Sequence, residues 1–389
     1  MTPVPDSGLS PPPLSLYVHL PWCVRKCPYC DFNSHAVKGE IPADDYIDAL
    51  FRDLEQDLPL VWGRTVQSVF FGGGTPSLFS ASQVDRMLSG FRGLLNLAPG
   101  AEVTLEANPG TTEHDSFSAY GDAGINRISL GVQSFDDAML KAIGRIHGRH
   151  EVERALDSIT RSDIENFNLD LMYALPGQTV EAALADLRLA LAASPKHLSH
   201  YQLTLEPNTS FYVNPPVLPE DDLAWAMQEQ CAGLLEDSGY GNYEVSAWAR
   251  PGQECRHNLN YWEYGDFLGI GAGAHGKITL PAMQEVRRRV KRRHPQAWMQ
   301  GASEGDVLAE DLAIGPGERV FEFFLNQLRL REGVSKPMFA ARTGLPWDEV
   351  LGRVELAVAR GLLEDRGSRL VPTAVGWRFV NEIQAIFLP

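Results

Sequence analysis

Apolar runs and amphipathic stretches alternate along the first half of the chain. The runs are short and rich in β-branched and aromatic residues, as strands are, and the longer stretches between them have the apolar spacing of helices. The predicted strands are 14–20, 68–71, 102–107, 127–132, 166–173 and 197–205, and the predicted helices are 43–58, 80–95, 151–162 and 180–193. Six successive βα units predict an α/β fold with a parallel sheet, either a partial barrel or an open doubly wound sheet.

The pattern changes on both sides of this region. Residues 1–13 are proline-rich and predict a disordered tail. Residues 206–316 form an accessory α+β region with many aromatic residues and glycines. Residues 317–389 have the order helix, helix, helix, hairpin, which predicts a small winged-helix-like domain. Because this domain is not strongly basic, we expect it to pack or to dock a partner rather than to bind DNA.

Unusual residues gather where the predicted strands end. Ligands of parallel α/β sheets bind at the carboxyl ends of the strands, so side chains from separate strands should converge there. The residues concerned are a cysteine loop after the first strand, Gly72–Pro76 after the second, Glu106, Gln133, Asp170 and Thr204. This convergence predicts one binding site at one end of the sheet.

The cysteine loop has the spacing C-x-x-x-C-x-x-C. It contains Cys23, Cys27 and Cys30, and no fourth cysteine follows nearby. A four-iron cluster held by three thiolates keeps one iron open to a small molecule. Zinc is the alternative, but a structural zinc site takes four ligands, and His19 and His35 do not have ordinary zinc spacing. An odd total of five cysteines and the lack of a secretory signal argue against disulfides.

Composition limits the kinds of partner that the chain is expected to bind. The formal net charge of −16 argues against nucleic acid, and no apolar run is long enough to span a membrane. We therefore expect a cytoplasmic protein, whose reducing surroundings suit an iron–sulfur cluster, with any membrane association made through a partner. One basic run, 287–293, predicts a solvated helix face or, alternatively, a patch for anionic groups or an acidic partner.

The cysteine triplet and the Gly-Gly-Gly-Thr-Pro element together resemble the radical S-adenosylmethionine (SAM) superfamily. Within it, the chain is similar to the group around oxygen-independent coproporphyrinogen III oxidase, from Leu14 to the C-terminus, including the segment Leu16–Cys23 that leads into the cluster. The resemblance implies a partial (βα)6 TIM-like barrel over 14–205, a [4Fe-4S] cluster on the three cysteines, and SAM as cofactor. It also implies an external electron donor.

The same resemblance implies roles for the residues at the strand ends. Backbone groups of Gly73 and Gly74 would approach the methionyl end of SAM, and Arg145 would pair with its carboxylate. Glu106 would bind an amine or hydroxyl, and Gln133 and Asp170 would bind the ribose. The full set of implied SAM contacts is Tyr17, Tyr29, Gly73, Gly74, Thr75, Glu106, Gln133, Arg145, Asp170 and Thr204. For Tyr17 and Tyr29, packing in the core is the alternative.

Two departures separate this chain from the oxidases of that group. Phe32 stands where the oxidase type has a fourth cysteine, and only 22 residues precede Cys23, where the oxidase type has a long N-terminal segment. Both features are similar to the heme chaperones of the group. The resemblance thus implies a protein that binds heme as cargo and delivers it to apo-hemoproteins, which we expect to be respiratory. Oxidative decarboxylation of coproporphyrinogen III is the alternative function, so enzymatic activity stays open, as does the choice of monomer or dimer.

A second motif supports heme handling. His257, Asn258, Tyr261 and Trp262 fit the H-N-x-x-Y-W motif that the chaperones have. A neutral imidazole can ligate heme iron, and the two aromatic side chains offer flat faces to a porphyrin. The alternatives are a hydrogen-bonded core histidine beside buried aromatic side chains, or ligation by Cys255.

Overall fold

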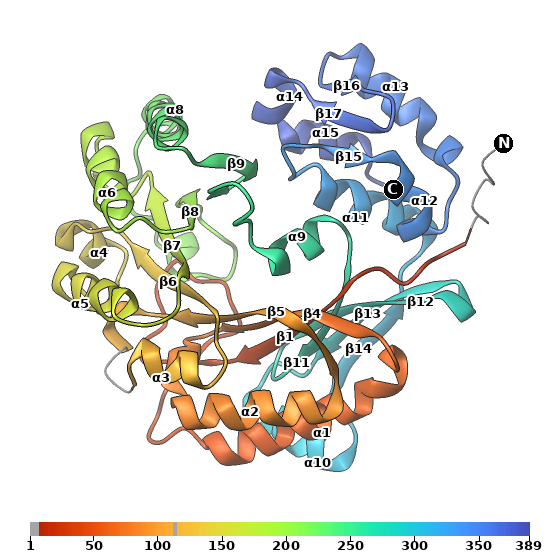
Figure 1. The fold of residues 1–389 in the computed structure, drawn as a ribbon. Coiled ribbons are helices and arrows are strands. Elements are labelled where there is room, and N and C mark those ends of the chain that lie inside the picture. The colour runs from red at the N-terminus through yellow and green to blue at the C-terminus, as the bar shows by residue number, and fades with distance from the viewer. Residues whose placement is uncertain (1–7, 112–114) are drawn as a thin grey trace.

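The computed structural model describes residues 8–111 and 115–389. Its centre is one sheet with the strand order β14-β13-β12-β11-β1-β4-β5-β6-β7-β8-β10-β9 (Figure 1). The six predicted strands form its parallel middle, which confirms the α/β fold and the partial barrel. They are β1 (Leu14–Leu20), β4 (Thr65–Gly73), β5 (Asn96–Ala107), β6 (Arg127–Gln133), β7 (Asn166–Tyr173) and β8 (His197–Gln202).

The accessory region lengthens this sheet at both edges. Beyond β8 lie the antiparallel strands β10 (Ala247–Ala249) and β9 (Gly241–Glu244). On the other side, β11 (Asp266–Ile270) pairs in parallel with β1, and β12 (His275–Leu280), β13 (Glu285–Lys291) and β14 (Leu308–Ala313) continue antiparallel. The first strand of the chain is therefore an interior strand of the sheet.

Helices cover the outer face because each parallel strand turns apolar side chains outward. On β1 these are Leu14, Leu16, Val18 and Leu20, all buried. Figure 1 shows α1, α2 and α10 under one part of the sheet and α3–α6 and α8 along the rest. The outer helices are α1 (Ala43–Val61), α2 (Ala81–Leu94), α3 (Phe117–Asp122), α4 (Asp137–Ala142), α5 (Arg149–Thr160), α6 (Val180–Ala192), α8 (Asp221–Asp237) and α10 (Pro295–Glu304). The short helix α7 (Ser210–Val213) lies instead beside the cysteine loop, where the Phe211 N–H donates to the Pro28 carbonyl.

The concave face of the sheet is polar. The alternate residues of β1 are Ser15, Tyr17 and His19, and the other parallel strands likewise turn polar side chains inward. Helix α9 (Arg256–Trp262) fills the end of this interior that lies nearest the starts of the strands, where Asn260 Nδ2 donates to Ser15 Oγ at 3.0 Å. The opposite end, at the carboxyl ends of the strands, stays open.

The basic run 287–293 is a strand, so the predicted helix face was wrong. It falls mostly on β13, where alternate side chains are buried against α1: Arg289 pairs with Asp57 at 2.5 Å, and Lys291 pairs with Asp53 at 2.5 Å and with Asp57 at 2.8 Å. Buried cations need such partners, and these partners lie more than two hundred residues away in the sequence.

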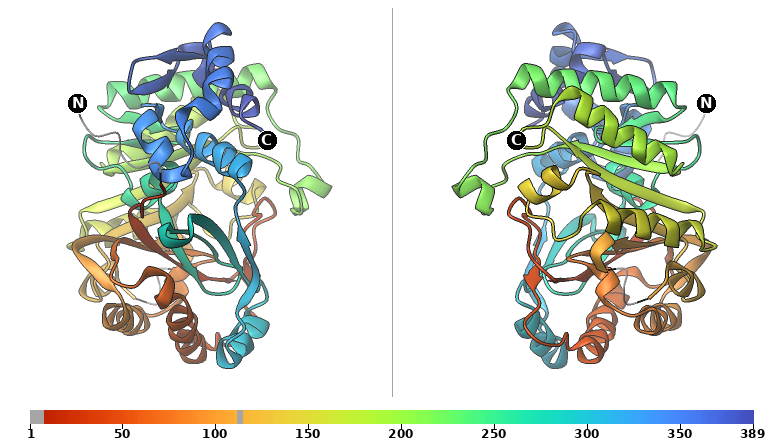
Figure 2. Two further views of the ribbon diagram at one scale, coloured as in Figure 1. Left: turned by 90° about the vertical axis from the view of Figure 1, so that its right-hand side faces the viewer. Right: turned by 90° about the vertical axis from the view of Figure 1, so that its left-hand side faces the viewer.

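The C-terminal part is a second, smaller unit with its own core. Its helices enclose an aromatic cluster in which Phe324 and Phe387 stack with ring centroids 3.6 Å apart. The predicted three helices and hairpin are confirmed. The elements are α11 (Pro316–Gln327), β15 (Val334–Ser335), α12 (Lys336–Thr343), α13 (Leu351–Ala359), β16 (Leu363–Asp365), β17 (Arg369–Pro372), α14 (Ala374–Arg378) and α15 (Val380–Ile386). Figure 2 shows this unit at the end of the molecule opposite α1, α2 and α10.

The predicted N-terminal tail divides in two. Residues 1–7 lie outside the described residues, whereas 8–13 do not fit the prediction of disorder, because Leu9 is buried with Val286 and Ile314, and the Ser10 N–H donates to the Ala341 carbonyl. Within the described ranges no helix is both long and apolar enough to cross a membrane.

Candidate functional site

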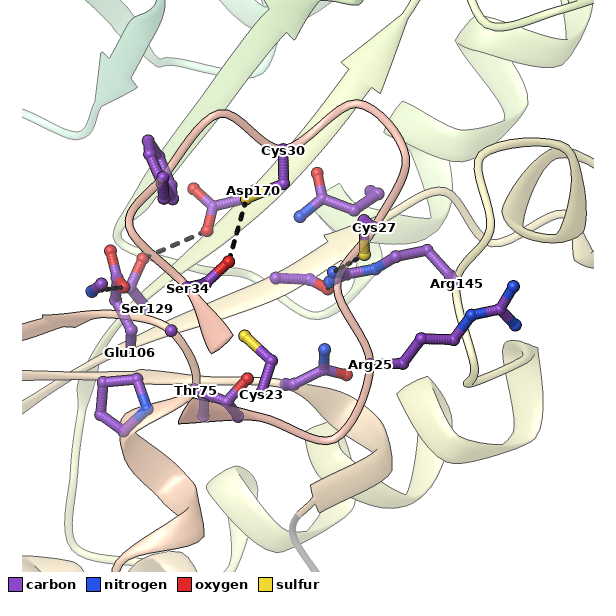
Figure 3. Close-up of a pocket in the computed structure, with 18 of the residues that line it drawn as sticks. Cys23, Arg25, Cys27, Cys30, Ser34, Thr75, Glu106, Ser129, Arg145 and Asp170 are labelled. Atoms are coloured by element: carbon purple, nitrogen blue, oxygen red, sulfur yellow. Dashed lines mark hydrogen bonds between the residues drawn. The ribbon is translucent and has the colours of Figure 1, made fainter. Parts of the chain in front are cut away.

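The cysteine loop lies over the carboxyl ends of the parallel strands. It starts at β2 (Trp22–Cys23) and returns at β3 (His35–Ala36), which pairs with β2. Cys23, Cys27 and Cys30 are half-buried free thiols arranged around one opening (Figure 3). Burial raises the pKa of the Cys23 and Cys30 thiols. The cavity beneath the loop holds most of the residues that the sequence predicted for the site.

Two glycines let the loop and the strands come together. Gly73 has φ of 110°, and a Cβ there would lie 2.5 Å from the imidazole of His19. A Cβ at Gly74 would lie 2.5 Å from the Trp22 carbonyl oxygen. Only glycine permits both contacts, so these residues are needed for packing between β4 and the cysteine loop. Thr75, which follows them, also lines the cavity.

Two carboxyl groups face the cavity from the strands on either side of β6. Glu106, on β5, accepts from the Gly73 N–H at 3.2 Å, and Asp170, on β7, accepts from Asn168 and Ser129. Burial, together with the charge of Asp170, raises the pKa of Glu106 to about 8, and burial raises the pKa of Asp170. A cationic ligand bound beside these two carboxyl groups would stabilise their ionised form, so the cavity favours a ligand that carries positive charge.

A guanidinium and an amide occupy the other side. Arg145 donates to the Gly131 carbonyl through Nη2, and its Nη1 lies 3.5 Å from Cys27 Sγ, while its Nε is buried without a hydrogen-bond partner among the described residues. Gln133 ends β6 with φ of 68° and accepts from the Tyr201 hydroxyl at 2.7 Å. A positive φ at a non-glycine residue costs energy, and the surrounding contacts, here the Tyr201 hydroxyl, hold the residue in place. Tyr29 lines the same cavity.

Two predicted residues lie apart from the cavity. Tyr17 faces the barrel interior, where its hydroxyl lies 3.1 Å from His19 Nδ1, and it lines a neighbouring cavity instead. Thr204 is exposed beyond the end of β8, and its hydroxyl donates to Glu206 at 2.8 Å. The strand ends at Gln202, so Thr204 falls in the following loop and not at the strand end.

Several lining residues were not predicted. They come from the cysteine loop, from the end of β5 and the residue after it, and from inward positions of β6 and β8: Arg25, Phe32, Ser34, Ala107, Asn108, Ser129, Gly131 and Tyr201. Period-two alternation could have found Ser129 and Gly131, because they share the face of Gln133 on β6. The loop residues carry no comparable signal.

The cavity fits a [4Fe-4S] cluster and SAM. Nowhere in the described ranges do three His, Cys, Asp or Glu side chains come close enough to share a single metal ion. The three free thiols of the cysteine loop are the donors that a [4Fe-4S] cluster takes, with one iron left open to a small ligand. The unpartnered Arg145 Nε and the acids with raised pKa fit a ligand that carries both a carboxylate and positive charge.

The H-N-x-x-Y-W motif lies on α9, at the closed end of the barrel. His257 is buried, with Nδ1 2.9 Å from Ser68 Oγ and Nε2 3.2 Å from the Tyr261 hydroxyl, and its ring stacks on Phe70. Burial, with the charge of Arg127, lowers its pKa to about 3. This is the arrangement of the alternative interpretation, a hydrogen-bonded core histidine.

Cys255, the alternative ligand, and the remaining motif residues lie on α9 or immediately before it. The Cys255 thiol donates to Glu102 at 3.5 Å and is buried. The Trp262 ring lies against Arg329, whose guanidinium carbon is 4.3 Å from the ring centroid, and Asn258 is half-buried on the same helix. The structure therefore does not bring the motif into the cluster cavity.

Family models cover both units of the chain. Residues 17–190 match the radical SAM superfamily, and residues 315–379 match the HemN C-terminal domain. Among solved structures, coproporphyrinogen III oxidase (HemN) from Escherichia coli superposes with a TM-score of 0.81 at 23% sequence identity, covering 97% of this chain and 90% of that one. At this identity the likeness shows the fold alone.

Curated relatives cover nearly the whole chain. The heme chaperone HemW of Escherichia coli (strain K12) is 50% identical over 380 residues, which is 97% of this chain and 98% of the relative. HemW of Haemophilus influenzae is 47% identical over 97% and 98% of the two chains. HemW of Mycobacterium tuberculosis is 34% identical over 96% and 95%.

Proposed function

The chain belongs to the heme chaperone HemW family of radical SAM proteins, and from this premise we propose that it binds heme and delivers it to apo-hemoproteins, respiratory ones among them. The observation that carries the proposal is the likeness to such chaperones along almost the entire chain. Phe32 adds support, because it lies in the cluster loop where an oxidase would have its fourth cysteine and is 60% exposed at the rim of the cavity.

Membership of the radical SAM superfamily implies a [4Fe-4S] cluster and SAM. We assign the cluster to Cys23, Cys27 and Cys30, which lie on one loop as free thiols. When bound, the two groups supply one-electron reductive cleavage of the sulfonium, fed by an external electron donor.

We assign the ends of SAM to different walls of the cavity. Glu106 and Asp170 bind its positive charge and hydroxyl groups, and Arg145 pairs with its carboxylate through the edge that has no protein partner. Gln133, fixed by the Tyr201 hydroxyl, presents its amide to the ribose. The backbone groups of Gly73 and Gly74, which line the cavity, contact the methionyl end of SAM in this proposal.

We place the delivery of heme in the cytoplasm, where five free thiols and an exposed cluster loop are compatible with reducing conditions. Contact with a membrane is then made through the recipient protein. Heme delivery needs no covalent change in heme, so in this proposal the cluster and SAM serve the delivery and no porphyrinogen is consumed.

The test is a heme-transfer assay with anaerobically reconstituted protein. We expect hemin to give a shifted Soret band on binding, and heme to move to an apo-cytochrome, followed by the recipient's own absorption spectrum. Parallel incubation with coproporphyrinogen III should yield no protoporphyrinogen IX. Transfer no faster than from free hemin, or conversion of the porphyrinogen, would refute the proposed function.

A further inference from the structure

A second cavity opens beside the cluster cavity, on the flank of the barrel mouth. It lies between the cysteine loop, β1 and the strands β11–β14, and shares Phe32, Gly73 and Glu106 with the cluster cavity. These three residues therefore form the boundary between the proposed SAM site and the second cavity. The other walls of the second cavity take no part in the SAM site proposed above.

Part of the wall of this second cavity is flat and aromatic, and the carboxylates of Asp31, Glu106 and Glu310 also line it. Phe32 stands at the boundary with the cluster cavity, 60% exposed. Tyr17 stacks on Phe70, and Tyr261 packs edge-on against Phe267 with centroids 4.4 Å apart, so both rings are held in place. Fixed aromatic side chains around an open space favour a flat, largely apolar ligand.

The basic run shows which cation of this region is available to a ligand. Five of its side chains are paired with carboxylates: Arg287 with Asp311, Arg288 with Glu322, Arg289 with Asp57, Lys291 with Asp53 and Arg292 with Asp306. Arg293, the next residue, lines the cavity and makes no ion pair or side-chain hydrogen bond with any residue that the structure describes. A ligand carboxylate can take this position.

An imidazole is available in the same cavity. His275 begins β12, is exposed, and makes no side-chain hydrogen bond within the described ranges. Desolvation and the charges of Arg288 and Arg293 lower its pKa, opposed by Glu310, so the neutral form that ligates iron is favoured. His257 differs on each count, because it is buried and both of its nitrogens are engaged.

We propose that heme sits in this second cavity, with the His275 imidazole as axial ligand of the iron and the Arg293 guanidinium bound to a propionate. The proposal rests on the heme-chaperone function proposed above and deepens it, since it gives the cargo a site next to SAM. The ligand role then belongs to His275 and not to His257, while Tyr261 of the H-N-x-x-Y-W motif contributes a wall.

The experiment is hemin titration of the full, reconstituted chain carrying His275→Ala. The iron–imidazole bond is lost, so we expect affinity to fall by about tenfold or more and the Soret band to move toward that of unligated heme. His275→Met should restore an axial ligand and give a third band position. His294→Ala is the matched control, an exposed histidine that lines a different groove, and it should leave the titration unchanged.

Metal-free protoporphyrin IX distinguishes the contribution of the axial ligand from that of the rest of the cavity. His275→Ala should bind it as the wild type does, because no iron is present. Arg293→Ala should bind both porphyrins roughly tenfold more weakly, since a charge-assisted hydrogen bond is lost, whereas Arg292→Ala should not. A wild type that binds no hemin would refute the proposed function. A wild type that binds hemin, with an unchanged spectrum and affinity in His275→Ala, would overturn only this site.

Discussion

The two ends of the barrel are built from the same kinds of side chain and differ in how those side chains are satisfied. At the closed end, Glu102 accepts from the Arg256 and His257 backbone N–H groups at 3.2 and 3.0 Å and from the Cys255 thiol. At the open end, Glu106 of the same strand accepts one backbone N–H at 3.2 Å and has a raised pKa.

The difference teaches that residue type alone does not mark a site. A cysteine and a glutamate occur at both ends. At the closed end Cys255 and Glu102 bond to each other, whereas at the open end Glu106 accepts one backbone N–H and lines a cavity. Buried polar groups that are fully paired stabilise the fold, whereas partly paired groups around a cavity are free to bind a ligand. The same substitution at the two ends should therefore have different effects.

The largest expected difference concerns the two cysteines Cys27 and Cys255. Cys27→Ala should remove the cluster iron entirely after anaerobic reconstitution, because one of the three thiolates is lost. Cys255→Ala should retain iron at the wild-type level, since that thiol only donates to Glu102. Iron analysis and the visible absorption of the cluster measure both. Full iron in Cys27→Ala would contradict the assignment of the cluster.

The next effect is on stability. Glu102→Ala removes the carboxylate that accepts from the first turn of α9 and that faces the buried charge of Arg127, so we expect a loss of roughly 3 kcal/mol. Glu106→Ala removes a carboxyl that is itself costly to bury and should change the free energy of unfolding little. Urea unfolding of both variants makes the comparison. Equal destabilisation would remove the distinction between the two ends.

A smaller effect is expected on SAM affinity. Glu106→Gln keeps the size of the side chain but cannot ionise when the cation of SAM binds, so we expect binding of SAM to weaken by roughly tenfold, the value of one charge-assisted hydrogen bond. Calorimetry on the reconstituted protein measures it. Glu153→Gln, on the outside of α5, is the control. Unchanged affinity in Glu106→Gln would remove this residue from the SAM site.

The last expected effect is a pH dependence of stability. Glu106 has a pKa of about 8 in the folded chain, against an ordinary value of 4.5. The folded state thus binds this proton more tightly, and the stabilisation is present in full below about pH 4.5 and is lost as pH rises through about 8. In protein without cluster or SAM, Glu106→Gln should gain stability relative to the wild type as pH rises through this window. Urea midpoints that run parallel would contradict the raised pKa.

Local patterns predicted the middle of the sheet and the cysteine loop. The six strands and their order along the chain could be derived from apolar runs, since each buries one face under a helix. The edges could not be, because β11 pairs with β1 across a separation of some two hundred and fifty residues, and the ordinary spacing signals are local. The basic strand was misread for the same reason: Asp53 and Asp57, which neutralise it, lie on α1.

The site was predicted where strand ends carried unusual residues, and missed where position depended on the loop or the strand boundary. Glu106, Gln133 and Asp170 lie in the cavity, whereas Thr204 falls two residues past its strand. Tyr201, which fixes Gln133, is an ordinary tyrosine in the sequence. Sequence could place His257 in a motif, but only the structure reveals that its nitrogens are occupied.

The pairing of β1 with β11 has a consequence for the chain while it is being synthesised on the ribosome. Leu14 opposes Asp266 in this pair, so one edge of the first strand lacks its partner until the last of the strands β1, β4–β8 and β11 has been synthesised. Until then that edge has free N–H and C=O groups that could join another chain. For most of its translation the nascent protein therefore has β1 without its second neighbouring strand.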